Sequence, residues 1–351
     1  AIAGVVYYMY TRPPTTPTVT VPDFVTNNIY IQEGGAQPQW LDPHVSYYQY
    51  DYEILQHSVE MLLWYNGNSS TQIIPWLSDS WTPSFTATSS NYTVTLRQGI
   101  KFQDGTPFNA TAVWFSLNRL LIIDGTDGSG NHGSQAAWIL QQLLDTSLSS
   151  SPDGTQSYNS TWVRKVLDQN FIQRVDDYTI KINTKLKTTQ FPYLLSQPWA
   201  AIVSPSEVVK REYARHPEWG AFDGNLTSYF VKAAGIGDTY FNVPQQGWKF
   251  GTGPYYLDNY DPTTFRVVLK VNTNYWGGPS NFQYGKIGVP TIKEIDFNYV
   301  ESFSTRLLDL KAGKATGIGV SPSDIYSVID RDTWLNSATF KSLIPGVVVY
   351  G

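Results

Sequence analysis

The chain has 351 residues, of which 41% are hydrophobic and 15% charged, so it can bury a large core and supports two or three folded units. Its formal net charge of −5 disfavours nucleic acid as a partner. Cysteine is absent from the sequence, which excludes disulfides, thiolate metal sites and cysteine nucleophiles.

The first 22 residues combine an apolar stretch, AIAGVVYYMY, with the Thr/Pro-rich stretch TRPPTTPTVTVP. Ten apolar residues are too few to cross a bilayer, which needs about 20. We expect residues 1–22 to be the remnant of a membrane anchor followed by a stiff stalk. The alternative is a short strand followed by an ordinary Pro-rich leader. The first interpretation predicts a domain at the cell surface, held to the membrane by its N-terminus only.

Asn-x-Ser/Thr sequons occur at Asn68, Asn91, Asn109, Asn159 and Asn225. They have meaning only in an exported protein, and chance is the alternative because Asn, Ser and Thr are abundant here. Asn109 also stands where it can cap a helix, and a glycan would compete with that cap. We therefore expect sugars at Asn68, Asn91, Asn159 and Asn225, and least of all at Asn109.

In the first third of the chain, residues 28–32 are predicted to form a strand that ends in Glu33-Gly34-Gly35. Helical spacing of five apolar residues predicts a helix that stops at Asn66-Gly67: Ile54, Leu55, Val59, Leu62 and Leu63. Strict alternation predicts a strand over residues 92–96, and residues 100–102 return from it. A turn at Asp104-Gly105 then leads into a helix capped by Asn109.

Residues 124–160 are rich in Gly, Ser and Asp and are predicted to be a surface insertion around one helix, 136–144. Further strands are predicted at 178–182 and 267–271, and a helix at 301–313 with Gly313 as its stop signal. Strands and helices mixed in this order predict an α/β fold.

Little in the sequence indicates catalysis. Residues 128–133 match G-x-G-x-x-G, but no buried strand precedes them, so a loop is favoured over a dinucleotide site. The histidines have no zinc-ligand spacing on a helix: His44, His57, His132 and His216. Asp176 and Asp177 are neighbours whose side chains point to opposite faces of a strand. We expect no catalytic residue, no metal and no cofactor.

Aromatic residues are abundant, with 12 Trp, 24 Tyr and 16 Phe. A large core and surface tyrosines account for most of them. The functional interpretation is a cleft whose aromatic side chains hold an extended ligand. Many aromatics, few charges and no catalytic set favour binding over catalysis.

An ordered series of motifs resembles the solute-binding proteins of ABC importers, in the class that takes up oligopeptides and dipeptides. The series covers roughly residues 28 to 350. It consists of Leu41-Asp-Pro43, Pro75-Trp-Leu-Ser-Asp-Ser-Trp81, Tyr92-Thr-Val-Thr-Leu-Arg97, Gly99-Ile-Lys-Phe-Gln-Asp-Gly-Thr-Pro-Phe108, Val113-Trp-Phe-Ser116, Val175-Asp-Asp-Tyr-Thr179, Ser204-Pro205, Gly251-Thr-Gly-Pro-Tyr255, Asn274-Tyr-Trp-Gly-Gly278 and Arg306-Leu-Leu-Asp-Leu-Lys-Ala-Gly313.

The resemblance implies an extracytoplasmic receptor that binds oligopeptides between two lobes and delivers them to the membrane subunits of an ABC transporter. The implied fold is α/β, two-lobed and like a periplasmic binding protein, with an extra subdomain in lobe one and an incomplete lobe two. Its parts would be the anchor and stalk (1–22), the core of lobe one (23–55 and 190–317), the inserted subdomain (56–189) and the lobe crossover with the start of lobe two (318–351).

Family members run well past 450 residues, so we expect the remaining C-terminal part of the receptor to exist on another polypeptide or in further sequence. The resemblance places Gly34, Gly35 and Ala36 in the cleft, and Trp64, Tyr65 and Trp199 are candidate aromatic ligand contacts. Core packing is an equal alternative for these three. An oligosaccharide ligand and a structural surface-layer or filament glycoprotein are the alternative functions.

Overall fold

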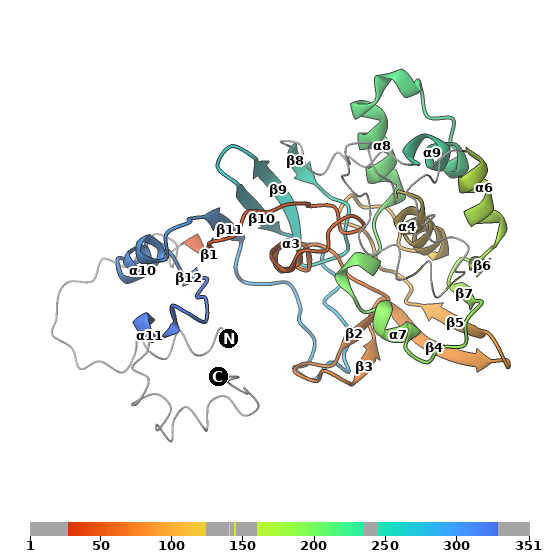
Figure 1. Cartoon of the computed structure of the whole chain (residues 1–351), viewed down its shortest axis with the longest axis horizontal. Helices are drawn as coiled ribbons and strands as arrows, with labels where there is room; N and C mark the ends of the chain where they lie inside the picture. Colours follow the sequence, from red (N-terminus) through yellow and green to blue (C-terminus); the bar gives the residue numbers. More distant parts are fainter. Residues whose placement is uncertain (1–26, 124–139, 141–143, 145–159, 235–244, 329–351) are drawn as a thin grey trace. The chain divides into compact units, whose positions relative to one another are not determined.

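The computed structural model describes residues 27–123, 140, 144, 160–234 and 245–328. The chain divides into two compact units, one formed by residues 1–37 with 292–351 and the other by residues 38–291. Figure 1 colours the elements of both units along the sequence. The four-part division expected from the sequence, with its anchor, lobe core, insertion and crossover, stays a prediction.

The first unit contains a parallel arrangement of three strands. Strand β1 (Ile29–Gly34) pairs in parallel with β11 (Glu294–Tyr299) on one side and with β12 (Gly317–Ile318) on the other. Helix α10 (Phe303–Lys311) connects β11 to β12, and the short helix α11 (Ile325–Val328) follows. Because parallel strands point the same way, the carboxyl ends of all three meet at one edge.

Helix α10 has the boundaries that its sequence signals predict. The Ser302 side chain accepts a hydrogen bond from the Thr305 amide at 3.3 Å and caps the first turn. Gly313 follows the last turn with φ 71°, a left-handed conformation that favours glycine. The predicted stop at Gly313 is confirmed.

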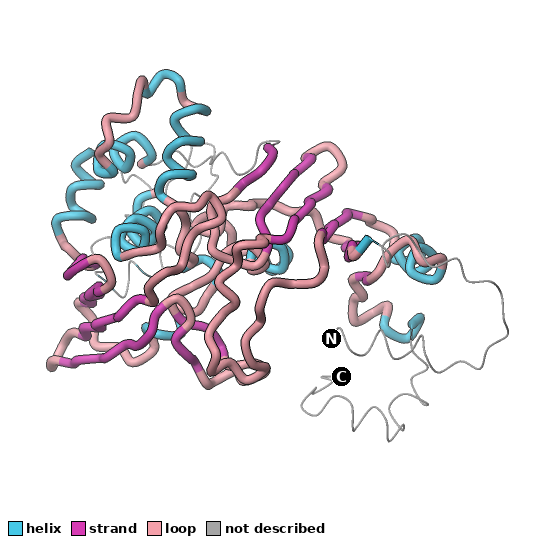
Figure 2. Tube along the Cα trace, turned by 180° about the vertical axis from the view of Figure 1, so that it is seen from behind, coloured by secondary structure: helices cyan, strands magenta, loops and turns pink. Residues whose placement is uncertain are grey.

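The described part of the second unit contains a two-stranded antiparallel sheet, β2 (Leu63–Tyr65) with β3 (Ile73–Pro75), and two larger antiparallel arrangements, whose strands Figure 2 shows as segments joined by loops. One has the order β10 (Arg266–Val271), β9 (Tyr255–Asp261) and β8 (Gln245–Trp248). The other has the order β4 (Ser78–Phe85), β5 (Ser90–Leu96), β7 (Thr179–Thr184) and β6 (Ile172–Asp176). Alternate residues of β5 are buried, as the alternating sequence predicts.

Helix α4 (Ala110–Ile122) is central to the helical part of this unit (Figure 1). It contacts strands β6 and β7 and lies among α6 (Ser160–Asp168), α8 (Pro205–Arg215) and α9 (Leu226–Ala233). The Asn109 side chain accepts a hydrogen bond from the Ala112 amide at 3.1 Å, so the predicted cap is confirmed. Neighbours on several sides explain why nearly every residue of α4 is buried.

The turn before α4 also has the predicted geometry. Gly105 has φ 88°, and Asp104 Oδ1 accepts hydrogen bonds from the Thr106 amide at 2.9 Å and its hydroxyl at 2.6 Å. Asp104 Oδ2 accepts a third from the Ser204 hydroxyl at 2.5 Å. Asp104 is thus a turn residue whose carboxylate accepts three hydrogen bonds, two from Thr106 within the turn and one from Ser204.

The helix predicted from Ile54 to Leu63 is wrong. Helix α3 (Gln49–Leu55) ends at Leu55, and Leu63 already belongs to strand β2 (Leu63–Tyr65), which pairs with β3 (Ile73–Pro75). Glu60 forms an isolated antiparallel bridge with Ile202. The apolar residues are buried as expected, but tertiary contacts, and not a helix, bury them.

The remaining described elements are short. They are α7 (Phe191–Leu194), η2 (Pro198–Ala200) and η3 (Pro217–Trp219). The returning stretch 100–102 forms only a single bridge, between Lys101 and Pro107. No helix in the part of the chain that the structure describes is long and apolar enough to cross a membrane. The proposed anchor and stalk, residues 128–133, His132 and Asn159 lie outside the described residues.

Candidate ligand-binding site

The first candidate group lies at the carboxyl end of β1. Gly34 is the last residue of the strand and is buried, whereas Gly35 and Ala36, directly after it, are exposed. The Gly34 carbonyl accepts a hydrogen bond from the Val300 amide at 2.9 Å, so the strand pairing continues to its last residue. The main chain then leaves the sheet with two small side chains. The structure therefore brings Gly34, Gly35 and Ala36 together on one turn.

Arg306 of α10 packs against this turn and binds the main chain that follows β11 and β12. Its Nη1 donates to the Val300 carbonyl at 2.6 Å and to the Glu301 carbonyl at 2.8 Å, and its Nε donates to the Gly319 carbonyl at 3.3 Å. A Cβ atom added to Gly35 would lie 2.9 Å from Nη1, closer than real Cβ atoms approach. Gly35 is thus required for the guanidinium to occupy this position. Sequence reasoning matched Arg306 only as the start of a motif and gave it no role.

Glu33 precedes the turn and is almost fully buried. Burial and then the nearby Asp309 raise the pKa of the Glu33 carboxyl, while Arg306 and Lys314 partly lower it. One carboxylate oxygen of Glu33 is buried without a hydrogen-bond partner among the described residues. The end of β1 therefore carries titratable groups of both signs as well as the two glycines.

The second candidate group is aromatic and belongs to the other unit. Trp64 and Tyr65, both in β2, are half-buried, with ring centroids 6.4 Å apart. Trp64 also packs against Trp76 at 6.4 Å, and Gln197 Nε2 donates to the Tyr65 hydroxyl at 3.2 Å. Trp199, the third aromatic candidate, is only 3% exposed and is part of the core. Of the three, Trp64 and Tyr65 are the ones that keep exposed surface.

A buried carboxylate fixes the aromatic residues next to Trp64. Glu60 Oε1 accepts hydrogen bonds from Trp76 Nε1 and the Tyr275 hydroxyl, both at 2.8 Å. Glu60 Oε2 accepts from the Thr252 hydroxyl and Trp276 Nε1, both at 2.7 Å. Burial raises the pKa of Glu60, and these four hydrogen bonds oppose that rise.

We call Glu60 and the four residues that donate to its carboxylate the Glu60 cluster: Trp76, Thr252, Tyr275 and Trp276. The indole of Trp76 meets Trp276 and Phe282 edge to face, at 6.4 and 5.3 Å between ring centroids. The cluster therefore sets the orientation of the surface on which Trp64 packs. Sequence reasoning did not find Glu60, although a single acidic residue inside the apolar run Val59–Leu63 is a signal for a buried, hydrogen-bonded carboxylate.

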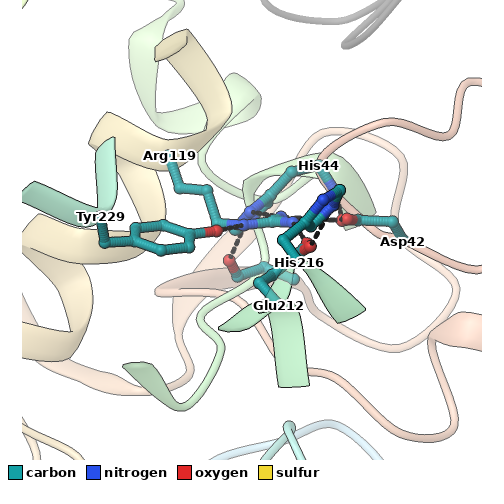
Figure 3. Close-up of polar contacts among 7 residues, drawn as sticks. Asp42, His44, Arg119, Glu212, His216 and Tyr229 are labelled. Atoms are coloured by element: carbon teal, nitrogen blue, oxygen red, sulfur yellow. Dashed lines mark hydrogen bonds and ion pairs between the residues drawn. The ribbon is translucent and has the colours of Figure 1, made fainter. Parts of the chain in front are cut away.

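A third polar group is fully buried and has the features of a structural cluster, shown in Figure 3. Arg119 of α4 pairs with both carboxylate oxygens of Asp42, and its Nε donates to the Tyr229 hydroxyl of α9 at 3.2 Å. Glu212 of α8 lies 3.7 Å from the same guanidinium. Four segments far apart in the sequence are thereby joined at one point.

Asp42, Arg119, Glu212, Tyr229 and His44 form what we call the Arg119 cluster. The imidazole of His44 is neutral in it. Its Nε2 donates to the Ala201 carbonyl at 2.9 Å, and its Nδ1 accepts from Arg119 Nη1 at 2.9 Å. Burial, followed by the charge of Arg119, lowers the pKa of His44 to about 4. Every polar atom that His44 offers is engaged within the protein core, so it is not available for proton transfer to a ligand.

The described residues contain no group of three or more His, Asp or Glu side chains placed to hold a metal ion. His44 and His57 form hydrogen bonds with main-chain or core partners. The ring of His216 stacks on that of Trp219, with 4.4 Å between the ring centroids. Asp176 accepts a hydrogen bond from the Tyr178 amide in the β6–β7 turn. These polar groups have partners within the protein, whereas the candidate residues that keep exposed surface in the described part of the chain are Gly35, Ala36, Trp64 and Tyr65.

Comparison with known families decides what this scaffold is. The family model described as "Bacterial extracellular solute-binding proteins, family 5 Middle" matches residues 72–345. The chain belongs to the family 5 extracellular solute-binding proteins. Family 5 proteins are extracellular or periplasmic substrate-binding receptors of ABC importers and not enzymes. The expected family and α/β fold class are confirmed.

Two kinds of relative support the assignment. The glutathione-binding protein GsiB of Escherichia coli O1:K1 is 28% identical over 245 residues, which cover 69% of this chain and 33% of that protein. The solved structure of Helicobacter pylori DppA with the peptide STSA has a TM-score of 0.51 at 19% identity, over 85% of this chain and 48% of that one.

Burkholderia pseudomallei OppA has a TM-score of 0.57 at 19% identity, over 87% of this chain and 48% of that one. At such identities the structural likeness shows the fold. The chain spans about a third of the length of the curated relatives it matches and about half of the solved structures.

Proposed function

We propose that this chain is part of an extracytoplasmic receptor that binds peptides and delivers them to the membrane subunits of an ABC importer. The observation that carries the proposal is the exposed Gly35-Ala36 turn at the carboxyl ends of three parallel strands. In open α/β sheets, ligands bind outside the carboxyl ends of the strands.

The chemistry of that turn suits a peptide. Small side chains let an extended peptide approach the main chain, where amide and carbonyl groups supply hydrogen bonds whatever the peptide's side chains are. The structural neighbour DppA is described in complex with a peptide, and GsiB is described as glutathione-binding. Both names support a ligand with amide and carboxylate groups for this receptor.

An oligosaccharide is the second candidate ligand. Trp64 and Tyr65 are half-buried aromatic side chains, and Tyr284 is 67% exposed in the same unit. Aromatic faces of this kind stack on sugar rings. The β1 turn favours a peptide over an oligosaccharide, because its exposed main chain offers hydrogen bonds and no aromatic surface on which a sugar ring could stack.

Mass spectrometry of the ligand released from the purified protein tests the proposal. A peptide gives fragment ladders spaced by amino-acid masses, whereas an oligosaccharide gives hexose spacings. Isothermal titration with the peptide Ser-Thr-Ser-Ala and with a linear glucose tetramer provides the second measurement. Binding of the sugar alone would overturn the peptide assignment and keep the receptor function.

The proposal extends to how the receptor is placed at the cell surface. Residues 1–22 would tether it to the membrane, and Asn68, Asn91, Asn159 and Asn225 would carry glycans. In support, Asn68 is exposed in the loop between β2 and β3. Asn225 is also exposed, but its side chain accepts a hydrogen bond from the Thr227 amide at 2.9 Å and caps α9, so a glycan there would compete with the cap, as at Asn109. The remaining C-terminal part of the receptor would supply the other wall of the ligand site.

A further inference from the structure

Arg306 lies where the carboxyl ends of the three parallel strands meet. Its hydrogen bonds reach the Val300 and Glu301 carbonyls, directly after β11, and the Gly319 carbonyl, directly after β12. On the third side it is packed against Gly35, directly after β1. One guanidinium thus touches the chain at the end of each of the three parallel strands that the structure describes in this unit.

The charge of this guanidinium is not balanced at contact distance. Arg306 is 5% exposed, yet its three acceptors are neutral carbonyls, and it forms no ion pair with a carboxylate in the described part of the chain. Buried charges in proteins are normally paired with an opposite charge, because desolvation is costly. Arg119, which is also deeply buried, has such a pair in Asp42.

One nitrogen of Arg306 is also unused. The guanidinium has five N–H donors, and those on Nε and Nη1 are engaged. Nη2 makes no hydrogen bond to any residue that the structure describes. A Cβ atom added to Gly35 would lie 2.9 Å from Nη1, 3.3 Å from Cζ and 3.4 Å from Nη2, so the guanidinium packs against the exposed turn and its unused nitrogen is within reach of it.

We propose that Nη2 of Arg306 binds a carboxylate oxygen of the ligand where the ligand passes Gly35. Glu33 and Asp309 lie near enough for Arg306 to act on the charge of Glu33, but neither forms an ion pair with Arg306. A ligand carboxylate would supply the acceptor oxygen for Nη2 and a negative charge in direct contact with the guanidinium. Gly35 has two functions in this arrangement, because the missing side chain makes room for Arg306 and leaves the ligand a path to it. The inference rests on the proposed peptide-receptor function and specifies which ligand group the receptor recognises here.

A double-mutant cycle between the protein and the ligand tests it. The full chain and its Arg306→Gln variant are titrated with Ser-Thr-Ser-Ala and its C-terminal amide, and with Ser-Thr-Glu-Ala and Ser-Thr-Gln-Ala. For one of these pairs, loss of the carboxylate should weaken binding to the wild-type chain roughly tenfold or more. The same change should alter binding to Arg306→Gln less than twofold.

Arg306→Gln also loses main-chain hydrogen bonds, so a second variant keeps the test independent of folding. Gly35→Ala retains Arg306 but forces Nη1 away from the turn, and it should remove the same carboxylate preference while the melting temperature stays within a few degrees. Equal carboxylate preference in the wild-type chain and both variants would overturn the inference. Failure of the wild-type chain to bind any of the four peptides would instead overturn the proposed function.

Discussion

Arg119 and Asp42 form a two-point ion pair in which neither side chain has any exposed surface. The Nη1–Oδ1 and Nη2–Oδ2 distances are 3.0 and 2.7 Å. Burial alone would raise the pKa of Asp42, but the charge and hydrogen bonds of Arg119 lower it below its usual value. The pair connects the segment before α3 to helix α4, so the fold of the helical part depends on it.

Replacing Asp42 with alanine should destabilise the protein by about 3–5 kcal/mol, because the buried Arg119 would lose its two-point carboxylate partner and keep only the longer 3.7 Å contact with Glu212. The matched control is Asp79→Ala, which breaks the exposed pair of Asp79 with Arg97 and should cost at most about 1 kcal/mol. Urea unfolding followed by circular dichroism measures both. Similar losses for the two variants would contradict the assigned role of the Arg119 cluster.

Acidification should destabilise the protein through His44. The folded-state pKa is lowered to about 4, whereas an unfolded histidine titrates near 6.5. As pH falls below about 6.5 the unfolded chain takes up a proton that the folded chain resists until about pH 4. Stability is therefore lost between these two values, by about 3 kcal/mol in total.

The measurement compares wild type with His44→Gln across pH 4 to 7. Glutamine can donate to the Ala201 carbonyl and accept from Arg119, but it takes up no proton. The raised pKa of other carboxyls, such as Glu60, is common to both proteins, so the difference between the two curves isolates His44. A constant difference between the curves would show that His44 is not the group responsible.

Glu60→Gln should disturb the aromatic surface beside Trp64. The amide has one acceptor oxygen and one donor nitrogen, so two of the four donors that now point at the carboxylate would lose their acceptor. We expect a loss of about 2–4 kcal/mol and a red shift of tryptophan fluorescence, since Trp76 and Trp276 are hydrogen-bonded to Glu60. Glu301→Gln, at an exposed side chain, is the control and should change neither quantity.

Features set by neighbouring residues could be predicted from the sequence. The alternation of residues 92–96 predicts strand β5, and Asn109 and Gly313 mark the ends of two helices, because strand alternation and helix caps are local. The Asp104-Gly105 turn was predicted for the same reason. These elements also carry the motifs that resemble those of the family.

Features set by distant residues could not be predicted. Apolar spacing from Ile54 to Leu63 fits a helix, but Glu60 is held by donors from Thr252 and the Tyr275–Trp276 pair, about 200 residues away in sequence. Those contacts and the bridge to Ile202 override the local preference. The role proposed for Arg306 depends in the same way on three strand ends that meet only in the fold.

Glycan occupancy should differ between sequons according to their surroundings. The Asn68 side chain is exposed, whereas the half-buried Asn109 caps α4 by accepting from the Ala112 amide. In protein purified from its native source, Asn68 should be occupied and Asn109 unoccupied. Mass spectrometry of intact glycopeptides measures both sites in one digest. Sugar on Asn109 would contradict the expected difference in occupancy between the two sites.

Alanine variants of Trp64 and Trp199 should distinguish a role in ligand binding from a role in core packing. Trp199 is 3% exposed, so Trp199→Ala should cost about 3–5 kcal/mol of stability through the cavity it leaves. Trp64 is half-buried and packs on Trp76 from one side, so Trp64→Ala should cost less and affect a ligand that stacks on its exposed face.

Titration with the glucose tetramer and with Ser-Thr-Ser-Ala then shows which ligand uses that face. If the peptide is bound at the β1 turn through main-chain hydrogen bonds, Trp64→Ala should change peptide affinity less than about fivefold, whereas a stacked sugar should lose roughly tenfold or more. Unfolding measured on the same samples excludes a general loss of structure. A tenfold loss of peptide affinity in a variant with wild-type stability would place the peptide on Trp64 and away from the glycine turn.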